Sequence, residues 1–463
     1  MPQQPLDLFG QNPPGFPIRP GDFEIIEERY DAGHLLLVTN VGQINMPGPG
    51  GNNWVLVYRL DSTTGLRTSD LPKVISSNYM GHQGQNGPEF VRLNRPGQGE
   101  ELGVLYSGIG PPDATGFSVQ DVYLSTRAES PTAWDDFGTP APLNAQPAGL
   151  GFPVDSGGYY SSTSDFEGWY PGPGMANPSP ENAIDLFGSK ASLGAHYGLI
   201  GDSTPTNVHA TLTSGPAPMT SVNTVARHPK LPRTYHATGC DAVQCGVFGV
   251  TIPVPGAATY HGMMYSPASG SVMSVQRQTL RGAEHPDAPG RYVWFMVDDA
   301  SNVHVLVEDR RTVVPTWTAL TDPNGLDHFP PPSHPDQMPN YYAPAQAQAE
   351  HMHIAVADDA APGQRGEVVG YYQWRDGAVL FGPNYNGSYS ITVRVDPYTN
   401  ALTAQQLYTT VSVDQYGNQT VAIGRFSLVS HGAELVWLRG ARAWAVYYLL
   451  PTNNVDVYMD LLP

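Results

Sequence analysis

The chain reads as a succession of short apolar runs separated by polar turns. The runs are rich in Val, Tyr, Trp, Phe and Thr, and several of them alternate apolar with polar residues at period two. Such residues in such a pattern fit the half-buried, pleated surface of a β-strand. We therefore expect strands at 34–40, 53–60, 101–107, 120–127, 245–252, 291–298, 302–308, 351–358, 367–374, 378–381, 388–395, 420–426, 434–438, 443–450 and 455–461.

The segments between these runs contain turn-forming sequences such as DSTTG, RDG, DPYTN and DQYGN. Gly, Asn, Asp and Pro favour the tight backbone conformations of β-turns. We find no helical pattern longer than two turns. Many short strands without helices indicate an all-β sandwich, barrel or propeller.

One stretch, residues 89–144, narrows this choice. It contains Leu105-Tyr106-Ser107, then Asp121-Val122-Tyr123-Leu124-Ser125-Thr126-Arg127, then Trp134 and Pro142-Leu143-Asn144. These pieces resemble one blade of the TolB-type, WD40-like β-propeller repeat, with fainter echoes at 158–189 and 292–320. The resemblance implies a β-propeller-like fold of six or seven irregular blades, or of five. A multi-sheet β-sandwich is the alternative.

The domain organisation follows from the distribution of proline. Residues 1–22 contain prolines at positions 2, 5, 13, 14, 17 and 20, a spacing that we expect to prevent both helix formation and ladder pairing. We therefore interpret 1–22 as an extended N-terminal arm. Residues 23–463 are expected to form a single large β-propeller-like domain with long loops.

Composition excludes several classes of partner. Charged residues make up 14% of the chain and the formal net charge is −19, with Lys73, Lys190 and Lys230 as the lysines. Nucleic-acid binding requires clustered basic residues, so we expect no nucleic-acid partner. No run reaches the ~18 apolar residues of a membrane span, so we expect no membrane insertion. The first residues lack the pattern of a signal peptide.

The segment 155–175 carries the richest candidate chemistry. It combines a Gly-rich backbone with acids and aromatic rings, and we expect it to be a long loop. Aromatic rings stack on sugars, and paired carboxylates are what glycoside hydrolysis uses. Our candidate ligand-binding residues are Tyr159, Tyr160, Trp169, Tyr170, Tyr371, Tyr372 and Trp374. Were the protein an enzyme, the candidate catalytic acids would be Asp155, Asp165, Glu167 and Asp185.

Two further pairs of residues could carry chemistry. His351 and His353 stand at alternate strand positions, a weak candidate for a metal site that we weigh below a polar surface without any ion. Cys240 and Cys245 are candidates for a disulfide, with reduced thiols as the alternative. We expect no cofactor; calcium was considered as well, but the sequence does not support it.

The sequence therefore leaves two functional hypotheses. The first is a non-catalytic structural or binding protein, outside the cell or on a virus particle, such as a spike, tail or capsid-associated protein or an adhesin. It would contact a glycan or other surface ligand, or the partner subunits of a larger assembly. The second is a carbohydrate-active enzyme, a glycoside hydrolase or lyase, on a β-propeller. Because no compact acid pair stands at successive strand ends, we favour the first.

Overall fold

The computed structural model describes the strands and most of the turns of the chain; in the third and sixth sheets along the chain it describes the backbone alone. The described residues are 4–8, 18–43, 54–77, 88–95, 99–112, 118–142, 165–169, 185–190, 194–199, 206–216, 218–231, 234–252, 257–267, 280–285, 288–297, 302–321, 324–328, 348–356, 368–375, 388–395, 402–406, 410–413, 419–422, 434–449 and 456–461.

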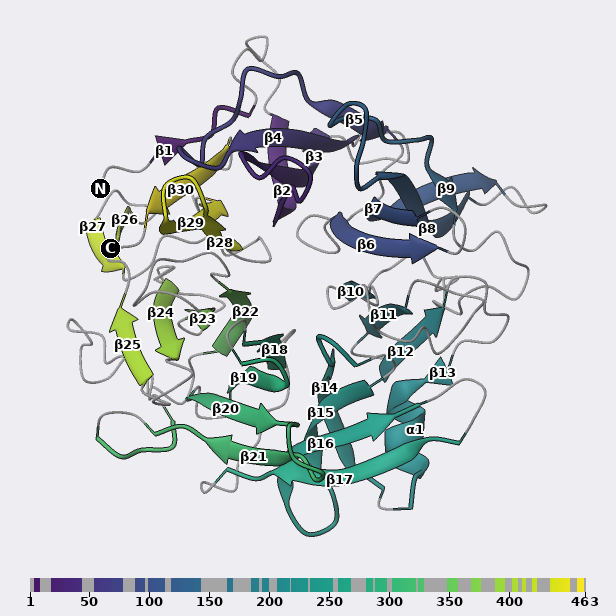
Figure 1. Ribbon diagram of the computed structural model, residues 1–463, viewed down its shortest axis with the longest axis vertical. Helices are drawn as coiled ribbons and strands as arrows, with labels where there is room; N and C mark the ends of the chain where they lie inside the picture. The colour runs from purple at the N-terminus through teal and green to yellow at the C-terminus, as the bar shows by residue number, and fades with distance from the viewer. Residues whose placement is uncertain are drawn as a thin grey trace.

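Seven four-stranded antiparallel sheets stand around a common axis, which is the arrangement of a β-propeller (Figure 1). We number these blades 1 to 7. Blade 1 contains β2 (Ile18–Glu27), β3 (His34–Gln43), β4 (Trp54–Asp61) and β5 (Lys73–Ser76). Blade 2 contains β6 (Glu89–Arg95), β7 (Gly99–Pro112), β8 (Ser118–Ala128) and β9 (Ala141–Pro142). Blade 3 contains β10 (Asp165–Trp169), β11 (Asp185–Lys190), β12 (Gly194–Leu199) and β13 (Thr206–Asn207).

The ring continues in the same way. Blade 4 contains β14 (Ser221–Arg227), β15 (Thr234–Cys240), β16 (Cys245–Thr251) and β17 (Thr259–Tyr265). Blade 5 contains β18 (Leu280–Glu284), β19 (Arg291–Val297), β20 (Val303–Asp309) and β21 (Thr316–Ala319). Blade 6 contains β22 (Gln348–Val356), β23 (Val368–Arg375), β24 (Ser388–Val395) and β25 (Leu402–Gln406). Blade 7 contains β28 (Glu434–Leu438), β29 (Ala443–Leu449), β30 (Val457–Leu461) and β1 (Gln4–Pro5).

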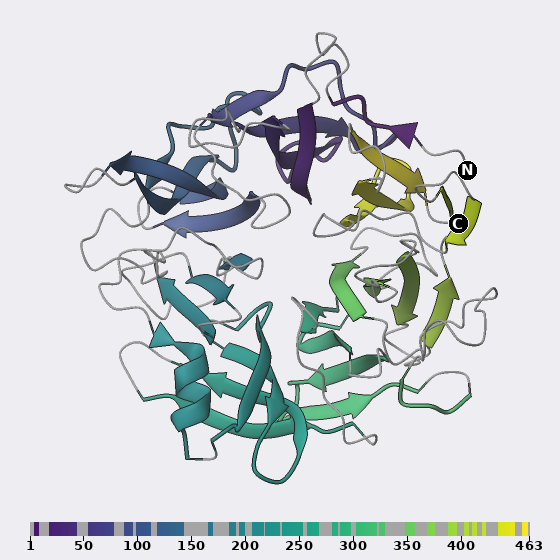
Figure 2. The same ribbon diagram turned by 180° about the vertical axis from the view of Figure 1, so that it is seen from behind.

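Two small elements stand outside the blades. A short helix, α1 (Val208–Ser214), follows β13, and a two-stranded hairpin pairs β26 (Thr410–Val413) with β27 (Gln419–Ala422). Within each blade the first strand lies nearest the axis (Figure 2). Neighbouring first strands contact each other there, as β2 does with β6 and with β28.

In the part of the chain whose side chains are described, several apolar runs form strands with both faces buried. In β3, Leu35 and Leu37 belong to the apolar cluster between blades 1 and 7, whereas Leu36 and Val38 belong to the cluster between blades 1 and 2. Alternate side chains of a strand point to opposite faces, so a strand covered on both sides needs an unbroken apolar run. The sequence HLLLV satisfies this requirement.

The N-terminal segment closes the ring. Gln4 and Pro5 pair with Met459 and Tyr458 of β30, and so become the outermost strand of blade 7. Leu6 and Leu8 are buried beside this blade. The carboxylate of Asp456 accepts hydrogen bonds from the backbone N–H groups of Asp7 (2.6 Å), Leu8 (3.1 Å) and Val457 (2.9 Å).

The predicted all-β propeller is confirmed, with seven four-stranded sheets among the described residues. The stretch 89–144, on which the blade resemblance depends, supplies all four strands of blade 2. The expectation that proline prevents ladder pairing throughout residues 1–22 is wrong: Pro5 lies in β1 and Pro20 in β2. An edge strand is hydrogen-bonded on one side only, so a proline can direct its missing N–H to the unpaired side.

We predict that Asp456→Ala lowers the free energy of unfolding by about 2 kcal/mol, because backbone N–H groups at the closure lose their acceptor. The matched control is Asp241→Ala, whose carboxylate accepts from the N–H groups of Val243 and Gln244 in an exposed turn. Urea denaturation of both variants provides the comparison. Equal losses in the two variants would contradict the closing role of Asp456.

Candidate functional site

The structure gathers several of the predicted site residues onto blade 3. Asp165, Glu167 and Trp169 occupy alternate positions of β10, the innermost strand of this blade, and Trp169 pairs in register with Asp185 of β11. The expected loop at 155–175 is therefore wrong for residues 165–169, which form a strand. Asp155, Tyr159, Tyr160 and Tyr170 lie outside the described residues.

A second group falls on blade 6. Tyr371, Tyr372 and Trp374 lie in β23, and His351 and His353 lie in the neighbouring strand β22. His353 pairs in register with Tyr371, and His351 pairs with Gln373. In blade 4, Cys240 and Cys245 are register partners at the hairpin between β15 and β16 and form a disulfide.

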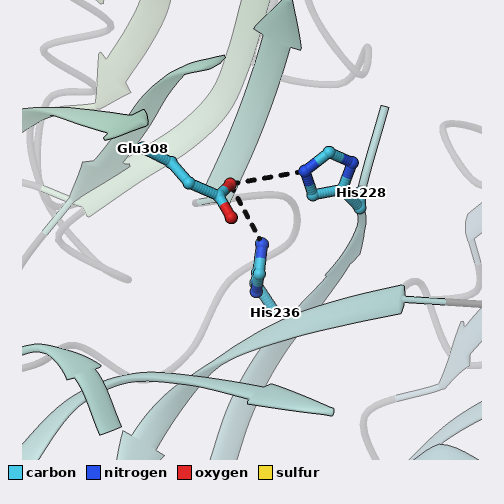
Figure 3. Close-up of side chains that lie close together, drawn as sticks. All are labelled: His228, His236 and Glu308. Atoms are coloured by element: carbon cyan, nitrogen blue, oxygen red, sulfur yellow. Dashed lines mark ion pairs between the residues drawn. The ribbon is translucent and has the colours of Figure 1, made fainter. Parts of the chain in front are cut away.

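A group of buried polar side chains lies between blades 4 and 5. The sequence analysis did not identify it. It consists of His228, His236 and Glu308, which we call the His–Glu centre (Figure 3). Nε2 of each imidazole lies 3.4 Å from Oε2 of Glu308, and all three side chains are 0% exposed. The centre is thus a buried carboxylate approached by two imidazole rings.

The strand registers explain why these side chains meet. Glu308 of β20 pairs with Tyr292 of β19 on one side and with Trp317 of β21 on the other, so the three residues share the face of blade 5 that is directed at blade 4. His236 of β15 lies between Ala226 and Gly249 on the opposing face of blade 4. The small neighbours leave room for the imidazole ring.

An aromatic wall encloses the centre. The ring of Trp294 lies over Gly282, its register partner, where a Cβ atom would approach the indole to 2.5 Å. Trp294 stacks on Trp317, with ring centroids 5.9 Å apart, and the edge of His236 meets both indoles. The indole N–H of Trp294 donates to Oε2 of Glu308 at 2.9 Å. The wall therefore excludes water from the carboxylate and supplies it with a donor.

The hydrogen bonds of His228 determine which of its ring nitrogens carries the proton. Its Nδ1 accepts hydrogen bonds from the backbone N–H groups of Lys230 (3.1 Å) and Leu231 (3.0 Å). A neutral imidazole has one nitrogen that accepts and one that donates. Its proton is therefore on Nε2, the nitrogen that faces Glu308.

Burial and hydrogen bonding set the charge states. Burial lowers the pKa of His228 to about 4, although the neighbouring Glu308 carboxylate opposes this shift. For Glu308, burial would raise the pKa, but the hydrogen bonds from His228 and His236 outweigh it and hold the pKa far below its usual range. Arg310 also donates from Nε to Oε1 of Glu308. At neutral pH the centre thus pairs a carboxylate with a guanidinium and neutral His228.

Two imidazoles and a carboxylate are also a donor set that zinc and iron use, so we tested whether these residues fit a metal. A ligating histidine normally donates its second ring N–H to an acceptor. His228 instead accepts two backbone N–H groups at that nitrogen, which keeps the proton on Nε2. Both carboxylate oxygens already accept hydrogen bonds, one of them from Arg310, whose positive charge opposes a cation. The arrangement fits a hydrogen-bonded clasp between blades and does not fit a metal centre.

The interface between blades 1 and 2 contains a comparable clasp. Glu28 is the first residue after β2, as His228 is the first after β14, and each reaches the third strand of the next blade. Nη2 of Arg127 in β8 donates to Oε1 of Glu28 at 2.8 Å, and both side chains are buried. Here the acid follows the first strand and the base lies on the third strand of the next blade, whereas between blades 4 and 5 the positions of acid and base are reversed.

A repeated motif in the sequence marks this position. His228-Pro-Lys-Leu-Pro-Arg-Thr-Tyr235 and His285-Pro-Asp-Ala-Pro-Gly-Arg-Tyr292 share the pattern His-Pro-x-x-Pro-x-x-Tyr. In both copies the histidine donates its backbone N–H to the carbonyl six residues later, that of Thr234 or Arg291, at 2.8 Å. The sequence signal that could have pointed to His228 is therefore this repeat, and it is not a metal-binding or catalytic motif.

Comparisons with known proteins identify no family for this chain: no family model matches it, and neither does any curated protein. Among solved structures, it is similar to an α-L-arabinofuranosidase from Fusarium graminearum, with 9% identity, a TM-score of 0.36, and 96% of this chain and 93% of that one covered. A lectin from Burkholderia pseudomallei matches with 10% identity, a TM-score of 0.41, and 96% and 100% covered. An α-L-arabinanase from Penicillium chrysogenum matches with 12% identity, a TM-score of 0.35, and 96% and 93% covered.

These likenesses are too distant to assign a site or an activity to this chain. Within the described part of the chain, no helix has the length and apolar character to cross a lipid bilayer.

We predict that the free energy of unfolding falls as the pH is lowered from about 6.5 to about 4. Unfolded His228 takes up a proton in this window and folded His228 does not, so protonation favours the unfolded state, and the stability is fully present above pH 6.5. The contribution is about 3 kcal/mol. The test is urea denaturation between pH 4.5 and 7.5, where the unfolding midpoint of His228→Asn should depend less on pH than that of the wild type. An equal pH dependence in the two proteins would contradict the assignment of this effect to His228.

We predict that Glu308→Gln lowers the free energy of unfolding at pH 7.5 by about 2 kcal/mol, because the charge-assisted hydrogen bonds are lost within an apolar interface. Glu284→Gln is the control, since Glu284 lies at the same interface with 24% of its side chain exposed. Thermal and urea unfolding of both variants provide the test. The clasp is disproved if the control variant loses as much as Glu308→Gln.

Proposed function

We propose that this protein is a non-catalytic binding propeller that recognises glycans, acting outside the cell or on a virus particle. The observation that carries the proposal is the composition of β10. This innermost strand of blade 3 has the sequence Asp-Phe-Glu-Gly-Trp. Two acids, two aromatic residues and a glycine thereby stand on one strand beside the propeller axis.

The chemistry of a sugar explains why this composition matters. A pyranose has apolar faces that pack on aromatic rings, and hydroxyl groups that donate to carboxylates. A strand fixes such residues more firmly than a loop, so less ordering is required on binding. Tyr371, Tyr372 and Trp374 on β23 offer a second aromatic group on blade 6.

A glycoside hydrolase is the second candidate, and one observation favours it. Asp165 and Glu167 on β10 and Asp185 on the adjacent strand β11 place three carboxylates on one hairpin of blade 3. Glycoside hydrolysis requires a pair of carboxyl groups at a suitable separation, one of them acting as acid. Sugar cleavage, as opposed to binding, is the property that separates the two candidates.

We predict that Trp169→Ala weakens glycan binding on the order of tenfold, because one stacking contact is lost. The experiment is a glycan-array screen of the purified protein, followed by titration of the best glycan and mass spectrometry of the bound sugar. Tyr30→Ala is the control, since Tyr30 is 62% exposed and lies in a turn of blade 1.

Binding that survives in Trp169→Ala as it does in Tyr30→Ala would overturn the assignment of blade 3. Cleavage of the bound sugar that disappears in Glu167→Gln would replace the binding proposal by the hydrolase.

A further inference from the structure

We propose that the turn after β14 is an acid-released latch between blades 4 and 5. The latch comprises residues 228–231, and the buried ring of His228 holds it closed. Two of its backbone N–H groups, those of Lys230 and Leu231, donate to Nδ1 of this ring. The other ring nitrogen faces Glu308 in blade 5 at 3.4 Å. One imidazole therefore fixes the turn and joins it to the neighbouring blade.

Protonation of the ring must open this arrangement. Because Nε2 already holds the proton of the neutral ring, a second proton taken from solvent binds at Nδ1 and uses the lone pair that accepts from the turn. The N–H groups of Lys230 and Leu231 then face a third N–H group. Part-buried donors that lose their acceptor are unfavourable, so the turn moves away and hydrates its backbone.

The charged groups around His228 make this response specific. From blade 5 the ring faces Glu308, with Arg310 and Tyr292 beside it, and from blade 4 it faces His236. Glu308 and Arg310 already neutralise each other, so a further proton leaves a net positive charge in an apolar interface. His261, on β17, adds a further imidazole near Arg310. Its pKa is lowered first by burial and then by the positive charge of Arg310.

The turn itself lies at the surface, which makes release feasible. The side chain of Lys230 is 50% exposed and pairs with Glu284 of blade 5 at 3.5 Å. The backbone of the turn can therefore reach water without dismantling the strands. The lysine–glutamate pair retains a tether between the blades after the ring has been released.

The position that His228 occupies in blade 4 is filled differently in blades 5 and 1. The second copy of the motif has His285, 1% exposed, at the corresponding position of blade 5. Blade 1 has Glu28 instead, paired with Arg127. Histidine is the side chain whose unperturbed charge change falls between pH 5 and 8. The acid response is thus expected where the position carries histidine.

The test is hydrogen–deuterium exchange read by mass spectrometry on the full-length protein at pH 7.5, 5.5 and 4.5, with each rate divided by its intrinsic rate. We expect the opening equilibrium of residues 229–231 to rise on the order of 50-fold between pH 7.5 and 4.5, because the opened imidazole regains its ordinary proton affinity. The amides of β20 should keep their protection over the same range.

The control variant is His228→Asn, whose Oδ1 can accept from the same two N–H groups but does not titrate. Its turn should show no rise at acid pH. The latch is refuted if the wild-type turn shows no rise, if His228→Asn rises equally, or if β20 opens by the same factor, which would indicate global unfolding. Should His228→Asn not fold, the comparison of residues 229–231 with β20 in the wild type remains decisive.

Discussion

Blade 1 of this protein has two apolar faces, and neither can be left exposed to water. The alternate leucines of β3 show the constraint most directly, since Leu35 and Leu37 pack toward blade 7 and Leu36 and Val38 toward blade 2. Burial of such faces is the main favourable contribution to folding. A row of sheets would leave two faces uncovered at its ends, whereas a closed ring leaves none. The pairing of β1 with β30 closes the ring, and the buried carboxylate of Asp456 fixes the segment that makes this pairing possible.

Within these apolar interfaces, charged groups are tolerated where they are mutually satisfied. A buried charge is costly unless it is paired and hydrogen-bonded. Glu28 pairs with Arg127 and Glu308 with Arg310 at comparable places in two interfaces, and two imidazoles lie 3.4 Å from Glu308. The two solutions differ in chemistry. The first is a carboxylate–guanidinium pair, while the second includes histidine, the side chain whose charge changes between pH 5 and 8.

Local pattern predicted fourteen of the thirty strands that the structure describes, those that coincide with runs of apolar and β-branched residues. The stretch 89–144, which resembles one propeller blade, supplies the strands of blade 2. Local pattern failed where a long-range contact decides the outcome: Pro5 pairs because β30 presents an edge to it, and residues 165–169 form a strand because β11 lies beside them. The His–Glu centre joins residues from two blades, so no local motif encodes it. Comparing His228 with His285 would have revealed the recurring position, though not its partner Glu308.

The chemistry of the centre depends on which nitrogen of His228 carries the proton. With the proton on Nε2, the ring places this N–H 3.4 Å from Glu308 and accepts hydrogen bonds from the turn at Nδ1, so the centre joins two blades. With the proton on Nδ1, Nε2 would be free to bind a metal. The proposed glycan site on blade 3 is independent of this choice.

The most direct measurement is neutron diffraction from a crystal grown at pH 7.5 and exchanged into D₂O. We predict deuterium on Nε2 of His228, none on Nδ1, and deuterated backbone amides of Lys230 and Leu231 directed at Nδ1. Deuterium on Nδ1, or an ion between His228, His236 and Glu308, would contradict the hydrogen-bonded clasp.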